Sequence, residues 1–125
     1  MSNGNILVVD DEPIVLDCCR LILEADGYIV HLVQSVDEAI EALRSRSYVL
    51  LLVDVKMPVR DGMSLMREVK ENWPEIPIVV MSGYPTRETI IAAAEIGAAR
   101  FIPKPFTPDE LLEVVRQFMQ KEEEG

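Results

Sequence analysis

The stretch Val49-Leu50-Leu51-Leu52-Val53-Asp54 decides how this chain folds, because five apolar residues run together and end on a carboxylate. A continuous apolar run with β-branched residues at both ends is typical of a strand buried on both faces, as in a parallel sheet. Met57-Pro58 and Asp61-Gly62 follow, and their proline and glycine indicate a loop. Asp54 then lies where open α/β sheets bind ligands, although taken alone it is equally compatible with capping the next helix.

The rest of the chain alternates strands with helices around this run. Short apolar segments predict further strands at residues 6–9, 28–33, 76–81 and 100–103. Helical spacing and capping signals predict helices that begin near residues 13, 35, 64, 86 and 107. Five strands alternating with five helices predict an α/β fold, with a parallel sheet covered by helices on both faces. The pattern alone leaves the strand order open.

Capping residues and apolar spacing predict where the helices begin and end and which side of the first helix faces the core. Ser35-Val36-Asp37-Glu38 and Thr107-Pro108-Asp109-Glu110 both match the capping box, and Gly97 is predicted to end the fourth helix. The inward face of the first helix is predicted from four residues at helical spacing: Val15, Cys18, Cys19 and Ile22. Neighbouring helical cysteines point in different directions, so we expect both to be reduced thiols in the core of a cytosolic protein.

Composition limits the function. A chain of 125 residues is expected to form one domain, at residues 1–120, with 121–125 as an acidic tail or linker stub. The net charge of −10 argues against direct binding to nucleic acid and favours cations or basic partner surfaces. The apolar runs are too short to cross a membrane, and the first five residues lack the features of a secretion signal. We therefore expect a cytoplasmic protein that contacts no membrane.

Polar residues stand where four predicted strands end: Asp10 and Asp11, Asp54, Ser82, and Lys104. The carboxyl ends of parallel strands share one edge of a sheet, so these side chains are expected to converge. Crowded carboxylates suit a hard divalent cation, and one of them can act as a nucleophile toward phosphorus. A lysine and a hydroxyl can then bind phosphoryl oxygens. Singly, the aspartates are as well explained as helix caps, and a serine or a lysine is most often a turn residue or a surface charge.

Four motifs in this order are similar to the receiver domain of bacterial two-component response regulators, of the chemotaxis-regulator type. They are Val8-Val9-Asp10-Asp11, Asp54 with Met57-Pro58 and Asp61-Gly62, Met81-Ser82-Gly83, and Lys104-Pro105-Phe106. The resemblance extends from Ile6 to about Gln120. It implies a flavodoxin-like (βα)5 fold, a doubly wound parallel sheet with strand order 2-1-3-4-5.

The resemblance also implies roles for the strand-end residues. Asp54 would accept a phosphoryl group from the phosphohistidine of a histidine kinase or phosphotransfer protein. Asp11 and Asp54 would bind Mg²⁺ or Mn²⁺ together with the backbone carbonyl of Lys56, and Asp10 would act through water. On this view the chain catalyses only its own phosphorylation and dephosphorylation.

Further residues would contact the phosphoryl group or respond to it. Ser82 and Lys104 would bind phosphoryl oxygens, with a cis bond between Lys104 and Pro105. Ser82 and Phe101 would form the switch, although phenylalanine lacks the hydroxyl of the tyrosine that is also common there. Lys56 and Tyr84 would flank the phosphoryl group and slow its hydrolysis.

Phosphorylation would change the face formed by the fourth helix, the fifth strand and the fifth helix. This face would control a partner protein or a linked output domain, and it allows a phosphorylation-dependent dimer. The sequence leaves open whether the receiver stands alone or belongs to a longer regulator or hybrid kinase.

Three other functions fit parts of the pattern. A flavodoxin has the same architecture, but Asp10-Asp11-Glu12 would repel the flavin phosphate. Haloacid-type phosphatases need a second aspartate two residues after the nucleophile, where this chain has Lys56. A receiver-like docking module that is never phosphorylated would not need every residue of the site. His31 is expected to be a half-exposed strand residue.

Overall fold

A computed structural model describes residues 4–55, 61–83 and 85–124, apart from the side chains of 120–124. Five parallel strands form one sheet in the order β2-β1-β3-β4-β5. The strands are β1 (Asn5–Val9), β2 (Ile29–Val33), β3 (Leu50–Asp54), β4 (Ile78–Ser82) and β5 (Arg100–Pro103). This arrangement confirms the predicted sheet and its 2-1-3-4-5 order.

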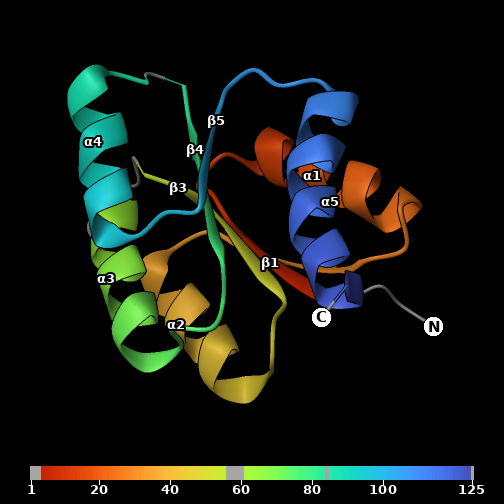
Figure 1. The fold of residues 1–125 in the computed structure, drawn as a ribbon, viewed down its shortest axis with the longest axis horizontal. Helices are drawn as coiled ribbons and strands as arrows, with labels where there is room; N and C mark the ends of the chain where they lie inside the picture. Colours follow the sequence, from red (N-terminus) through yellow and green to blue (C-terminus); the bar gives the residue numbers. More distant parts are fainter. Residues whose placement is uncertain (1–3, 56–60, 84, 125) are drawn as a thin grey trace.

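Helices cover both faces of the sheet, with α1 and α5 on one face and α2, α3 and α4 on the other (Figure 1). Their bounds are α1 (Pro13–Ala25), α2 (Val36–Ser45), α3 (Gly62–Asn72), α4 (Arg87–Ile96) and α5 (Pro108–Glu124). In the part of the chain that the structure describes, no helix combines the length and apolar character needed to span a bilayer.

The core consists of two apolar layers separated by the sheet. Alternate residues of a strand point to opposite faces, so Leu7 and Leu51 enter the layer under α2, α3 and α4. Ile6 and Leu50 enter the layer under α1 and α5. All five residues of β3 are buried, which confirms a strand covered on both faces. It begins at Leu50, so the half-buried Val49 of the apolar run lies just before it.

The predicted caps are present. The backbone N–H of Glu38 donates to Ser35 Oγ at 3.2 Å at the start of α2. At the start of α5, the Thr107 N–H donates to Glu110 Oε1 at 2.8 Å, and the Glu110 N–H donates to Thr107 Oγ1 at 3.1 Å. Gly97 ends α4 in the left-handed conformation, with φ of 118°.

The start of the third helix differs from the prediction. Helix α3 begins at Gly62 rather than near Ser64, because Asp61 is its N-cap. The Asp61 carboxylate accepts a hydrogen bond from the Ser64 N–H at 2.9 Å. The aspartate that looked like part of a loop therefore begins the helix, which brings the helix two residues closer to β3.

The predicted inward face of the first helix is also wrong in part. Cys19 is buried as predicted, but Cys18 is exposed and is not a core thiol. The buried residues of α1 are Leu16, Cys19 and Leu23, which lie at i, i+3 and i+7. Apolar residues occupy nearly all sides of this helix, so its sequence matches more than one helical face.

Candidate functional site

The structure brings the four predicted strand ends together at one edge of the sheet. Asp54 and Ser82 are the last residues of β3 and β4, while Asp10 and Lys104 directly follow β1 and β5. In the parallel register Asp54 pairs with Met81, and Ser82 pairs with Pro103. Adjacent parallel strands that end level with one another place their terminal side chains at one point.

Three of these residues form a buried base, which we call the site floor: Asp10, Asp54 and Ser82. Asp10 and Ser82 have no exposed surface, and Asp54 is 4% exposed. Asp11 and Glu12 are exposed above the floor, and we call them the site rim. Buried carboxylates are costly unless they are paired with a cation, so the floor needs a positive partner.

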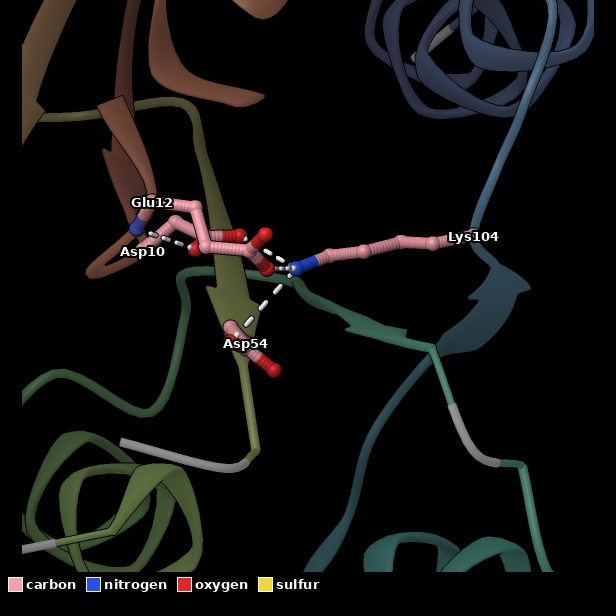
Figure 2. A network of polar contacts seen from close by, with 4 residues as sticks. All are labelled: Asp10, Glu12, Asp54 and Lys104. Atoms are coloured by element: carbon pink, nitrogen blue, oxygen red, sulfur yellow. Dashed lines mark hydrogen bonds and ion pairs between the residues drawn. The ribbon is translucent and has the colours of Figure 1, made fainter. Parts of the chain in front are cut away.

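Lys104 supplies that positive charge (Figure 2). Its ammonium Nζ lies 2.6 Å from Asp10 Oδ2, 3.2 Å from Glu12 Oε1 and 3.5 Å from Asp54 Oδ2. The lysine side chain is only 12% exposed, and it reaches across the edge of the sheet from the end of β5 toward β1 and β3. One ammonium therefore links three carboxylates from two strand ends.

Burial and pairing act in opposite directions on this network. Burial raises the pKa of Asp10, although the hydrogen bonds from Lys104 and from the backbone of Glu12 oppose this effect. Burial alone would lower the pKa of Lys104, but its hydrogen bond to Asp10 and the charges of Asp10 and Asp54 raise the pKa overall. The lysine is thus kept as a charged ammonium beside the floor.

Backbone contacts fix the side chains of the network. The Glu12 N–H donates to Asp10 Oδ1 at 2.9 Å, which leaves the other oxygen of Asp10 directed at Lys104. The Lys104 N–H donates to the carbonyl of Ser82 at 2.8 Å, which joins the ends of β4 and β5. The bond between Lys104 and Pro105 is cis, as the resemblance implied.

Gly62 packs directly against the backbone of the strand that carries Asp54. A Cβ atom on Gly62 would lie 2.3 Å from the Asp54 carbonyl oxygen and 2.7 Å from Val55 Cα. The Gly62 N–H also donates to the Val55 carbonyl at 3.1 Å. Only glycine permits this approach, so the first residue of α3 fixes the end of β3.

The carboxylates have the chemistry of a metal site. Asp10, Asp11, Glu12 and Asp54 each offer an oxygen, and these oxygens all lie within 4.8 Å of one another. Hard cations such as Mg²⁺ and Mn²⁺ prefer such ligands, so these residues fit the expected cofactor. The sequence does not predict the contact between Glu12 and Lys104, because Glu12 stands outside the four strand-end motifs.

Of the other predicted residues, one lies away from this network and two are not among the residues that the structure describes. Phe101 is half-buried and packs against the core layer under α2, α3 and α4. Lys56, with its backbone carbonyl, and Tyr84 lie outside the described residues. Their predicted roles in metal binding and in slowing hydrolysis stay predictions.

An open groove of about 540 Å³ adjoins the rim. It is lined by Glu12, Ile14, Val15, Cys18, Gly83, Lys104, Pro105 and Phe106. Ile14 and Leu21 lie two turns apart on α1, and each is 71% exposed. A mostly apolar surface therefore begins at the lysine and continues along α1.

The chain is similar in sequence to part of several bacterial transcriptional regulators. The hydrogenase transcriptional regulatory protein HoxA of Cupriavidus necator is 40% identical over 120 residues, covering 95% of this chain and 25% of HoxA. The DNA-binding transcriptional regulator NtrC of Escherichia coli is 30% identical over 117 residues, covering 94% of this chain and 25% of NtrC. The chain thus spans about a quarter of the length of these curated relatives.

Solved structures give the same relationship. A CheY-like receiver domain protein of Methanospirillum hungatei has a TM-score of 0.91 and 30% identity, covering 97% of this chain and 98% of that one. NtrX of Brucella abortus has a TM-score of 0.90 and 34% identity, covering 97% of this chain and 28% of NtrX. The response regulator receiver domain family model matches residues 6–116. This chain belongs to the response regulator receiver domain family.

Proposed function

We propose that Asp54 accepts a phosphoryl group from the phosphohistidine of a histidine kinase or phosphotransfer protein. Receiver domains act in general as phosphorylation-activated switches of two-component systems. The observation that supports Asp54 as the acceptor is its position at the end of β3, 4% exposed, with the Lys104 ammonium 3.5 Å from Oδ2. A carboxylate beside a fixed positive charge is placed to receive a group that adds negative charge.

In this transfer an Asp54 carboxylate oxygen forms a bond to phosphorus. The phosphorus–nitrogen bond of the phosphohistidine breaks, and its electron pair stays on the imidazole nitrogen. The Lys104 ammonium binds a phosphoryl oxygen, and the Ser82 hydroxyl donates a hydrogen bond to another. Phosphoryl transfer needs mainly positioning and charge stabilisation, and both can come from these residues.

Mg²⁺ or Mn²⁺ would be bound by Asp11 and Asp54, with Asp10 acting through water. Lys56 is proposed to add its backbone carbonyl. The bound cation would supply positive charge to the phosphoryl oxygens. The buried Asp10 then has two tasks, because it also accepts a hydrogen bond from Lys104 at 2.6 Å.

The phosphoryl group would act as a switch because it adds charge and acceptor oxygens at a buried point. Ser82 would move toward it, and the half-buried ring of Phe101 would fill the space that Ser82 leaves. Ser82 ends β4 and Phe101 lies in β5, so the face formed by α4, β5 and α5 would change. That face would control an output domain, a partner protein or a phosphorylation-dependent dimer.

The groove beside the rim is proposed as the docking surface of the phosphodonor protein. A donor must bring its phosphohistidine to Asp54, and the groove begins at Lys104 and opens onto α1. Exposed apolar side chains such as Ile14 and Leu21 favour a protein partner over a small charged molecule. Residues 1–120 would form the receiver, with 121–125 as a tail or linker, and the receiver would catalyse only its own phosphorylation and dephosphorylation.

Phosphorylation by a small donor tests the acceptor. We expect incubation with acetyl phosphate and Mg²⁺ to add one phosphoryl group, detected by intact mass and removed by hydroxylamine. Asp54→Ala should abolish the addition, and chelation of the metal should do the same. Asp17→Ala removes an exposed aspartate of α1 and should leave it unchanged. Undiminished labelling in Asp54→Ala would exclude Asp54 as the acceptor.

A further inference from the structure

We propose that Glu12 is a positioning residue for Lys104, and that its carboxylate holds the ammonium at the site rim and restrains phosphorylation of Asp54. This inference rests on the proposed function of Asp54. It gives a role to Glu12, which follows directly after the Val8-Val9-Asp10-Asp11 motif and is not part of it.

The geometry of the lysine supports this inference. Lys104 Nζ is nearer to Glu12 Oε1, at 3.2 Å, than to Asp54 Oδ2, at 3.5 Å. Figure 2 shows the Glu12 carboxylate meeting the ammonium from the β1 side, with Asp54 on another side of it. The ammonium is thus shared between a carboxylate at the rim and the carboxylate that is to be phosphorylated.

Glu12 is the partner that can release the lysine. An ammonium has three N–H donors, and Asp10 and Glu12 both accept from it. The Asp10 side chain is fully buried and is fixed by the Glu12 N–H, whereas the Glu12 side chain is 56% exposed. A phosphoryl group on Asp54 therefore gains the lysine most easily by displacing Glu12.

Neutralising Glu12 should consequently favour phosphorylation. The ammonium would lose one competing negative charge, since the glutamine amide oxygen is a neutral and weaker acceptor, and would stay closer to Asp54. Exposed ion pairs are weak, so the expected change is small. We expect Glu12→Gln to raise the rate of phosphorylation by acetyl phosphate about threefold, equivalent to about 0.65 kcal/mol.

Repulsion of the anionic donor by Glu12 would also predict a faster variant, and two comparisons separate the explanations. If Glu12 acts through the lysine, Glu12→Gln should have no effect in a Lys104→Ala background. Glu12→Asp keeps the charge but shortens the reach, so it should resemble Glu12→Gln. Repulsion instead predicts the same acceleration in the Lys104→Ala background and a wild-type rate for Glu12→Asp. Either of those results would overturn the proposal.

The measurement is the initial rate of phosphorylation with saturating Mg²⁺, with Glu24→Gln as the matched control. Glu24 is an exposed carboxylate in α1, and Glu24→Gln makes the same change in charge, so the rate of this variant should stay at the wild-type value. A rate raised equally by Glu24→Gln would assign the effect to net charge and overturn the role of Glu12.

A second readout needs neither metal nor phosphodonor. The free energy of unfolding in urea, measured with chelator, should give a favourable coupling between Glu12 and Lys104 in a double-mutant cycle. Additive effects of Glu12→Gln and Lys104→Ala would overturn the proposal. Because this cycle does not depend on phosphorylation, it still reports on Glu12 if Asp54 is not the acceptor.

Discussion

The site floor and the site rim differ in what holds them. Asp10, Asp54 and Ser82 are buried and take their places from strands in a fixed parallel register. Asp11 and Glu12 are exposed and belong to the turn between β1 and α1. A group fixed by the sheet can support the chemistry itself, whereas an exposed group can change its rate or its partner. We therefore expect large effects at the floor and a small effect at Glu12 of the rim. Asp11 is the exception at the rim, because it is proposed to bind the metal.

Apart from loss of Asp54 itself or of the metal, the largest effect is expected from Lys104→Ala, because it removes the cation that pairs with the floor. The phosphoryl group would lose its positive partner, and loss of one preorganised charge of this kind costs roughly a hundredfold in rate. Phosphorylation by acetyl phosphate should fall by that factor, and the spectral change on adding beryllofluoride should be lost. Circular dichroism should show that the fold is retained.

Lys104→Arg tests whether a positive charge of a different shape can replace the ammonium. A planar guanidinium is larger than an ammonium and cannot meet Asp10 at 2.6 Å and Asp54 at 3.5 Å in the same way. It should therefore not restore the response. Full response to beryllofluoride in either variant would mean that the floor does not depend on this cation.

The next effect is expected at Gly62, which contacts the floor only through the backbone. In Gly62→Ala the new Cβ would meet the Asp54 carbonyl oxygen at 2.3 Å, so the end of β3 or the start of α3 must move. Overpacking of this kind costs about 1–3 kcal/mol of unfolding free energy. The displaced acceptor should also be phosphorylated about tenfold more slowly.

Gly83→Ala is its control. Gly83 directly follows β4 at the site, but among the described residues a Cβ there would meet no atom within 4 Å, its chain neighbours aside. Its stability and its rate should stay near the wild-type values. Equal losses at Gly62 and Gly83 would show that glycine flexibility matters rather than the close approach to β3.

Sequence reasoning predicted the floor more easily than the rim, and the reason is physical. Apolar runs determine strands, and strands that run parallel must end at one edge, so the convergence of Asp10, Asp54 and Ser82 follows from the pattern. The contact between Glu12 and Lys104 joins residues 92 positions apart through the shape of two loops. No local pattern encodes that contact.

The errors elsewhere have similar causes. The close approach of Gly62 depends on where a helix packs, and Asp61-Gly62 signals a turn as well as a helix start. The exposure of Cys18 depends on which side of a largely apolar helix faces the sheet. In both cases tertiary packing chose between local structures that the sequence permits equally well.

A smaller effect on the rate of phosphoryl transfer is expected from a substitution in the groove beside the rim. Ile14→Ser should slow phosphoryl transfer from a phosphorylated kinase or phosphotransfer protein about fivefold, because an exposed apolar contact is lost on docking. The rate with acetyl phosphate should not change. Ile90→Ser alters an exposed apolar residue on α4, away from the groove, and should leave both rates unchanged. Slowing with acetyl phosphate would mean that Ile14 affects the site and not docking.

The smallest effect is expected at His31, which tests whether a polar group outside the site influences phosphorylation merely because it is partly buried. His31 in β2 is half-buried and outside the site, with its Nδ1 2.6 Å from the Tyr48 hydroxyl. Burial lowers the pKa of His31 from its ordinary 6.5, and the charge of Arg46 adds to this effect. The folded state then binds fewer protons than the unfolded state just below pH 6.5, so the free energy of unfolding should fall as the pH is lowered through this range.

His31→Gln should remove this pH dependence, measured as urea unfolding between pH 8 and pH 5, and leave the phosphorylation rate unchanged. Tyr48→Phe removes the hydroxyl but keeps the histidine half-buried, so the pH dependence should persist in that variant because burial is the main cause of the pKa shift. If His31→Gln instead slowed phosphorylation, a buried polar pair at the edge strand would influence Asp54 without contacting it. The floor would then owe its importance to burial in general and not to the convergence of its strand ends.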